Sequence, residues 1–152
     1  PRQNGLKDGA LVPTLIETLR NRRRPIIFGD GRAAQDFLFV DDAVAATLAA
    51  AEAPEAAGLA INVGSGQMAS VNEVLDILKR LLRTDLVPRL GRPRAGQAPP
   101  IRAQIALAER VLGWTPRVSL VSGLARAVQS FTDADDESLL AEVGPREQRA
   151  DV

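Results

Sequence analysis

The fold class is decided by residues 26–44, whose sequence is IIFGDGRAAQDFLFVDDAV. Its apolar start, Ile26–Phe28, is typical of a short strand, and the Gly-Asp-Gly that follows is typical of a turn. The aromatic and β-branched content of Asp36–Val40 predicts a second strand. An alanine-rich helix is expected over Ala43–Ala53. Strands and helices that alternate in this way predict an α/β fold.

The segments on either side of this stretch continue the alternation. Before it, apolar residues spaced three and four apart from Leu11 to Leu19 predict a helix that ends ahead of Pro25. After it, Leu59–Val63 predicts a third strand, and Gly64-Ser65-Gly66 predicts a tight bend. The pattern therefore extends well beyond the first two strands.

The clearest helix signal follows this bend. Ser70 and Glu73 form the S-x-x-E pattern of a capping box, in which each side chain satisfies an amide of the helix start. The apolar residues from Val71 to Leu82 then recur with helical spacing. A helix is therefore predicted over this segment.

The rest of the chain divides into a loop, two helices and a tail. Residues 86–101 contain four prolines and three arginines and are expected to be irregular. A helix is predicted over Arg102–Leu112, capped by Gly113, and a last one over Leu120–Phe131. We therefore expect a folded portion over 1–131 and a charged tail over 132–152, either a frayed helix or disordered.

Composition excludes several classes of function. The 152 residues fit one domain, and the formal net charge of zero gives no bulk attraction to nucleic acid or anionic lipid. The absence of Cys and His excludes disulfides, thiolate nucleophiles, Ser-His-Asp triads and the usual zinc sites, so no metal site is expected. No apolar run is long enough to span a membrane, and a cytoplasmic location is expected.

Five segments, in order, resemble the C-terminal half of the NAD(P)-dependent nucleotide-sugar epimerase/dehydratase family, the extended short-chain dehydrogenases. The matches run from the first residue to about Phe131. The segments are Pro1-Arg2-Gln3, Gly9-Ala10-Leu11-Val12-Pro13, Phe28-Gly29-Asp30-Gly31 with Asp36–Val44, Asn62-Val63-Gly64-Ser65-Gly66, and Leu112-Gly113-Trp114-Thr115-Pro116. Each is weak alone, but their order and spacing together indicate the family.

The resemblance implies a two-part enzyme. Its first half would bind NAD or NADP on a Gly-rich turn and supply a Tyr-x-x-x-Lys pair for proton transfer. This sequence contains no Tyr, and neither Gly29-x-Gly31 nor Gly64-x-Gly66 has the third glycine of that turn. We therefore expect an α/β substrate-binding portion that lacks most of the Rossmann domain and has no catalytic or cofactor-binding residue. The other half is expected before Pro1.

The resemblance also implies contacts to the nucleotide. Phe28 is the candidate for stacking on the base, with an ordinary core residue as the alternative. Val12 is a candidate for lining the same pocket, although core packing is the favoured interpretation.

Anion binding depends on arginines in this family, and the resemblance assigns them only in part. Arg94 carries over as one clamp on the diphosphate, against a solvated loop arginine as the alternative. Gln35 stands where the other arginine is expected, and Arg32 could reach in from the neighbouring loop. Gln97 replaces an aspartate expected near a ribose hydroxyl, and Gln104 replaces another aspartate.

Two charged runs have simpler explanations than a site. Arg22-Arg23-Arg24 could contact RNA, but without interleaved aromatic residues a solvated helix end is favoured. Asp41-Asp42 could be paired catalytic carboxylates, but a helix cap is favoured because the alanine-rich helix follows directly.

Two functions follow from these observations. The first is the nucleotide-sugar-binding portion of an NAD-dependent epimerase or dehydratase, partnered by its missing Rossmann half or by a second copy. The alternative is a non-catalytic binding or interaction module of the same origin. It is suggested by Gln35, Gln97 and Gln104, since the site could be altered or decayed.

Overall fold

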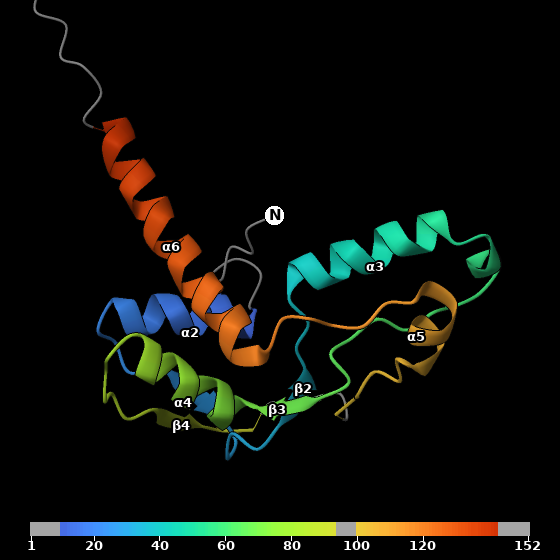
Figure 1. Ribbon diagram of the computed structural model, residues 1–152. Helices are drawn as coiled ribbons and strands as arrows, with labels where there is room; N and C mark the ends of the chain where they lie inside the picture. The colour runs from blue at the N-terminus through green and yellow to red at the C-terminus, as the bar shows by residue number, and fades with distance from the viewer. Residues whose placement is uncertain (1–9, 94–99, 143–152) are drawn as a thin grey trace, which may run out of the picture.

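The computed structural model describes residues 10–93 and 100–142, and within 133–142 it describes the helical backbone only. Strands and helices alternate along it, as expected for an α/β chain (Figure 1). In order, the elements are α2 (Leu11–Arg20), β1 (Ile26–Phe28), β2 (Ala34–Asp36), α3 (Val40–Glu52), the short 3-10 helix η1 (Pro54–Ala56), β3 (Met68–Ser70), α4 (Val71–Leu81), β4 (Arg89–Gly91), α5 (Ala106–Leu112) and α6 (Leu120–Glu142).

The strands form two separate pairs of three residues each. β1 pairs with β4 in parallel, with Phe28 opposite Gly91, and β2 pairs with β3 antiparallel, with Gln35 opposite Ala69. Such short ladders contribute few hydrogen bonds, so helix packing and side-chain hydrogen bonds must hold most of the structure.

The main core lies where α2, α4 and α6 pack together. The apolar face of α2 buries Leu15, Ile16 and Leu19, and α4 buries four apolar residues, among them Leu78 with no exposed surface. Ile27 of β1 enters the same core. Burial of these side chains is the chief stabilising contribution to this lobe.

A second, smaller core joins α3 to α5. It consists of Ala46, Ala108 and Trp114, and the indole Nε1 of Trp114 donates to the carbonyl of Asp42 at 3.1 Å. The small side chain of Ala46 therefore allows α3 and α5 to pack closely. α3 and α5 form a second lobe, which lies apart from the α2–α4–α6 lobe in Figure 1.

Several local predictions are confirmed. α4 begins with the capping box of Ser70 and Glu73, and α5 ends at Gly113, whose φ of 59° is left-handed. The strand Ile26–Phe28 and the helix from Leu11 are also present. These features depend on neighbouring residues alone.

The predictions for the other strands are wrong. β2 spans Ala34–Asp36 instead of 36–40, because Val40 already begins α3. Residues 59–63 form no strand, since no described segment pairs with them. Conversely, β3 and β4 are strands that the sequence did not predict. Which strands pair is decided by tertiary contacts that a short apolar run does not encode.

Two helix boundaries also differ. α5 begins at Ala106 and not near Arg102, and α6 continues past Phe131 to Glu142. The expected boundary between folded portion and tail thus falls inside a continuous helix. Residues 143–152 of that tail lie outside the described part of the chain.

The capping role expected of Asp41 or Asp42 is wrong. Phe39 is the N-cap residue of α3, and no side chain caps this helix. Asp42 is instead 4% exposed, and its carboxylate accepts the backbone amides of Arg117 and Val118 at 3.1 and 2.9 Å. It therefore ties α3 to the segment before α6.

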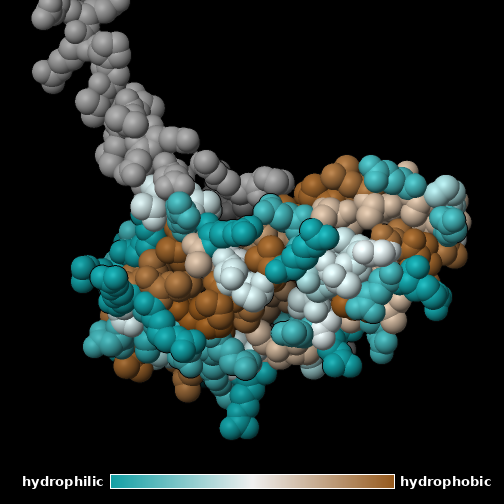
Figure 2. Space-filling view, viewed as in Figure 1, coloured by the Kyte–Doolittle hydropathy of each residue, from teal (hydrophilic) through white to brown (hydrophobic). Residues whose placement is uncertain are grey.

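One face of α3 exposes apolar side chains to solvent. Val40, Val44 and Leu48, spaced four residues apart, are 47%, 52% and 60% exposed. Leu59 and Val63 of the following segment are 48% and 38% exposed. Figure 2 shows brown, apolar atoms along this end of the molecule. We call these five residues the α3 apolar face. An exposed apolar surface of this kind is typical of a site that a partner covers.

No helix in the described part of the chain is both long enough and apolar enough to cross a bilayer.

Candidate functional site

Three of the predicted contact residues lie on one short connection between β1 and β2. Phe28 ends β1, Arg32 follows the Gly29-Asp30-Gly31 turn, and Gln35 lies in the centre of β2. All three are exposed. The structure therefore presents an aromatic ring, a guanidinium and an amide to solvent within one connection.

Phe28 lies on the outer face of β1. Its neighbour Ile27 points into the core and is 2% exposed, whereas Phe28 is 37% exposed, so Phe28 is not a core residue. On β4, a Cβ atom at Gly91 would lie 3.1 Å from the ring carbon Cδ1 of Phe28. Glycine at this position thus leaves room for the ring beside the β4 backbone.

The turn after Phe28 is built on glycine and on Asp30. Gly29 and Gly31 adopt φ angles of 78° and 73°, which favour glycine. The Asp30 carboxylate accepts the backbone amide of Arg32 at 3.0 Å, and it lies 3.7 Å from the Arg32 guanidinium. Arg32 is 87% exposed, so this ion pair contributes little and leaves the guanidinium mobile enough to meet an anion.

The remaining predicted residues do not join this connection. Val12 is half-buried on α2 and packs against the main core. Gln104 is exposed just before α5. Arg94 and Gln97 lie outside the described residues. The site therefore contains Phe28, Arg32 and Gln35 as its described members.

Sequence reasoning missed the residue that anchors this site. The carboxylate of Asp36, next to Gln35, accepts the amide of Ser65 at 2.7 Å and its hydroxyl at 2.5 Å. It also accepts the amides of Gly66 and Ala103, at 3.0 and 3.1 Å. The sequence offered one signal for this contact: Asp36 stands beside an apolar run, and a Gly-Ser-Gly bend at 64–66 could donate backbone amides to it.

These hydrogen bonds set the charge state of Asp36. Burial raises the pKa of this carboxyl, but the hydrogen bonds from Ser65, Ala103 and Gly66 lower it by more, so that it lies below its ordinary value of 3.8. Asp36 is therefore ionised at neutral pH, as an acceptor of four hydrogen bonds requires.

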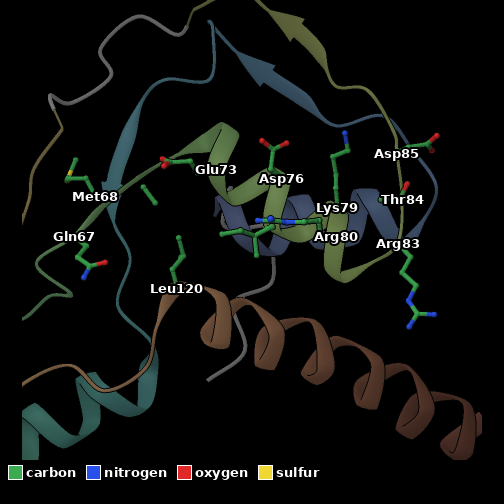
Figure 3. Close-up of a pocket in the computed structure, with 12 residues that line it drawn as sticks. Gln67, Met68, Glu73, Asp76, Lys79, Arg80, Arg83, Thr84, Asp85 and Leu120 are labelled. Atoms are coloured by element: carbon green, nitrogen blue, oxygen red, sulfur yellow. The ribbon is translucent and has the colours of Figure 1, made fainter.

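A groove lies elsewhere, between α4, the start of α6 and the loop after α4. It contains none of the predicted contact residues, and it is lined by Gln67, Met68, Ala69, Glu73, Asp76, Ile77, Lys79, Arg80, Arg83, Thr84, Asp85 and Leu120. In Figure 3 its acidic and basic side chains spread along the surface and do not converge on one point. We interpret this groove as the open surface between two helices.

Across residues 10–93 and 100–132, no group of three or more acidic side chains lies close enough together to hold a metal ion. The described site therefore offers hydrogen bonds, one aromatic face and one exposed guanidinium.

Comparison with known proteins identifies the family. Residues 1–64 match the model of the NAD dependent epimerase/dehydratase family. The UDP-glucose 4-epimerase of Mycolicibacterium smegmatis is 34% identical over 131 residues, which are 86% of this chain and 42% of that protein. The chain therefore belongs to the NAD-dependent epimerase/dehydratase family, as the sequence motifs indicated.

Solved structures give the same result for the fold. The crystal structure of UDP-glucose 4-epimerase from Thermotoga maritima with UDP-glucose matches 88% of this chain with a TM-score of 0.83 and 32% identity. UDP-glucuronic acid 4-epimerase from Bacillus cereus, in complex with UDP-glucuronic acid and NAD, matches 88% with a TM-score of 0.81 and 27% identity. The chain covers 43% and 42% of these two chains.

The chain thus spans about two fifths of the length of its relatives. It corresponds to their C-terminal portion and is a partial domain of the extended short-chain dehydrogenase fold. The expected fold class is confirmed.

We expect Asp36→Asn to lower the free energy of unfolding at pH 7 by about 2 kcal/mol, since its hydrogen bonds are charge-assisted but the carboxylate is partly exposed to water. Because the pKa of Asp36 is lowered in the folded chain, its contribution is complete above the ordinary value of 3.8 and disappears as the pH falls through the lower, folded value. Urea unfolding of both proteins between pH 7 and pH 2.5 measures this. A difference that stays constant down to pH 2.5 would contradict the assignment.

Proposed function

We propose that this chain supplies the nucleotide-sugar contacts of an NAD-dependent nucleotide-sugar epimerase or dehydratase. The observation that carries the proposal is the exposed connection on which Phe28, Arg32 and Gln35 follow one another. Relatives of the same fold were solved with UDP-glucose and with UDP-glucuronic acid, which supports a UDP-sugar as the ligand.

Phe28 is the proposed contact for the base. A nucleobase presents two apolar faces, and stacking on an aromatic ring is an effective way to hold it. The ring is 37% exposed, and Gly91 leaves room for it to lie beside the β4 backbone. Phe28 therefore has both the chemistry and the access that stacking needs, with Val12 proposed only as part of the pocket's support.

Arg94 is the proposed clamp on the diphosphate, with Gln97 near the ribose. A diphosphate loses many hydrogen bonds to water when it binds. Guanidinium groups replace them with paired, charge-assisted hydrogen bonds. Gln35 supplies an amide and no charge at the place of the second arginine. Arg32, which is 87% exposed and close in sequence, is the proposed substitute for that charge.

We propose that the redox chemistry belongs to a cofactor-binding portion outside these 152 residues. NAD or NADP would be bound there, and this chain would position the substrate. The sequence contains no tyrosine for the proton transfer expected in the family. The α3 apolar face supports this arrangement, because it is a surface on which a cofactor-binding portion or a second copy could pack.

The second candidate function is a binding module that has lost its catalytic context. It is favoured by the replacement of charged residues with Gln35, Gln97 and Gln104. The two functions differ in whether the site still binds a diphosphate, and this can be measured.

Phe28→Ala is expected to weaken the binding of UDP-glucose by about 1 to 3 kcal/mol, the contribution of one stacked base, with little change in stability. Titration calorimetry measures the affinity and thermal unfolding measures the stability. Ile26→Ala is the matched control, since Ile26 is 55% exposed on the same face of β1. Unchanged affinity with a large loss of stability would remove Phe28 from the site.

Arg94→Ala is expected to weaken the binding of UDP-glucose more than that of uridine, because only UDP-glucose carries the diphosphate. Arg92→Ala, two residues away, removes the same charge from an exposed position and serves as the control. Equal losses for UDP-glucose and uridine in the calorimeter would show that Arg94 does not clamp the diphosphate.

Gln35→Arg is expected to raise the affinity for UDP-glucose by about tenfold if the diphosphate site is intact, since one charge-assisted hydrogen bond pair is gained. The same titration with uridine is expected to show no gain. An affinity for UDP-glucose that does not rise would favour the second candidate function and a different ligand.

A further inference from the structure

The turn that follows Phe28 is held by the start of α4, although α4 lies about 40 residues further along the chain. The amide of Val71 donates to the carbonyl of Ala33 at 3.0 Å, and the amide of Asn72 donates to the carbonyl of Gly31 at 3.1 Å. The side-chain Nδ2 of Asn72 donates to the carbonyl of Asp30 at 3.0 Å. Three backbone carbonyls of the turn region, those of Asp30, Gly31 and Ala33, are thus bonded to one helix end.

The chemistry of a helix start explains why α4 can do this. The first amides of a helix have no partner within the helix. Ser70 accepts the amide of Glu73 through its hydroxyl at 3.2 Å, which leaves the amides of Val71 and Asn72 for the turn. The turn therefore completes the capping of α4, and α4 in return fixes the path of the turn.

Asn72 is the only one of these residues whose side chain reaches into the turn. Its terminal atoms lie so close to Gly31 that a Cβ atom there would overlap Oδ1 and lie 2.6 Å from Cγ. Gly31 also needs its left-handed φ of 73°. Glycine at position 31 therefore permits the contact, and Asn72 uses the space that the missing side chain leaves.

The contact with Asp30 extends to Arg32. The Asp30 carbonyl is held by Asn72, and the Asp30 carboxylate in turn accepts the amide of Arg32. The backbone between Phe28 and Arg32 is thus held in part by a side-chain hydrogen bond from a helix that carries neither residue.

We propose that Asn72 is a positioning residue of the nucleotide-sugar site. It acts through the Gly29–Gly31 turn and contacts no ligand, and it holds the backbone of the connection that carries Phe28, Arg32 and Gln35. This inference rests on the proposed function for its ligand, but its effect on the turn can be measured without one.

The decisive variant is Asn72→Asp. An acidic residue in the first turn of a helix suits the helix dipole, so α4 keeps its stability. The carboxylate cannot donate to the Asp30 carbonyl, so the turn loses its side-chain anchor. If Asn72 mattered only for the stability of α4, this variant would behave like the unaltered protein.

The experiment compares Asn72→Asp and Asn72→Ala with Ser70→Ala, all in the full chain. Ser70→Ala removes the capping box but leaves the hydrogen bonds between Asn72 and the turn, and so it is the control for a weakened α4. Thermal unfolding, the affinity for UDP-glucose and the rate of tryptic cleavage after the exposed Arg32 are measured for each protein.

The expected result separates stability from binding. Asn72→Asp and Asn72→Ala lose affinity by about three- to tenfold, the effect of one hydrogen bond, and are cleaved faster after Arg32. Ser70→Ala loses thermal stability but keeps both values within about twofold of the unaltered protein, since its turn is still anchored.

Two results would overturn the inference. One is Asn72→Asp with unchanged affinity and an unchanged cleavage rate. The other is Ser70→Ala with losses as large as those of the Asn72 variants, because a general weakening of α4 would then explain them. If the unaltered protein does not bind UDP-glucose, the proposed function fails, and the cleavage rates after Arg32 still decide whether Asn72 holds the turn.

Discussion

The carboxylate of Asp36 is the interaction on which the arrangement of this chain depends. It accepts hydrogen bonds from Ser65, Gly66 and Ala103, and so it joins the end of β2 to a bend and to the segment before α5. Gly64 makes this possible, because a Cβ there would overlap Ala103 and lie 2.9 Å from Asp36 Oδ2. Segments far apart in the sequence therefore converge on one charged group, whose desolvation the hydrogen bonds offset.

Side-chain bonds to the backbone have this importance because the sheets are so small. β1 with β4 and β2 with β3 each pair over three residues, too few to be stable alone. Asp42 repeats the role of Asp36 in the second lobe by accepting the amides of Arg117 and Val118. Asn72 anchors the turn after β1 by donating from its side-chain Nδ2 to the carbonyl of Asp30. Apolar packing thus stabilises each lobe by itself. Polar side chains add connections between segments that are far apart in the sequence.

Local signals in the sequence were sufficient for part of the structure. The capping box of Ser70 and Glu73, the glycine cap at Gly113 and the strand Ile26–Phe28 all depend on residues close together in the chain, and all were predicted. The partners of Asp36 and Asn72 lie about 30 to 70 residues away, so no local pattern could reveal them. The sequence therefore offered candidates for ligand contact, such as Phe28, which stay predictions, but it did not reveal the residues that hold this connection in place.

Contact and support are divided between different residues of the same connection. Phe28, Arg32 and Gln35 face solvent, whereas the hydrogen bonds from α4 to the backbone between Asp30 and Ala33 come from Val71 and Asn72. The end of β2 is held by Asp36. A change at a contact position, such as glutamine where the family pattern has arginine, therefore alters the charge offered to a ligand while the backbone geometry stays the same.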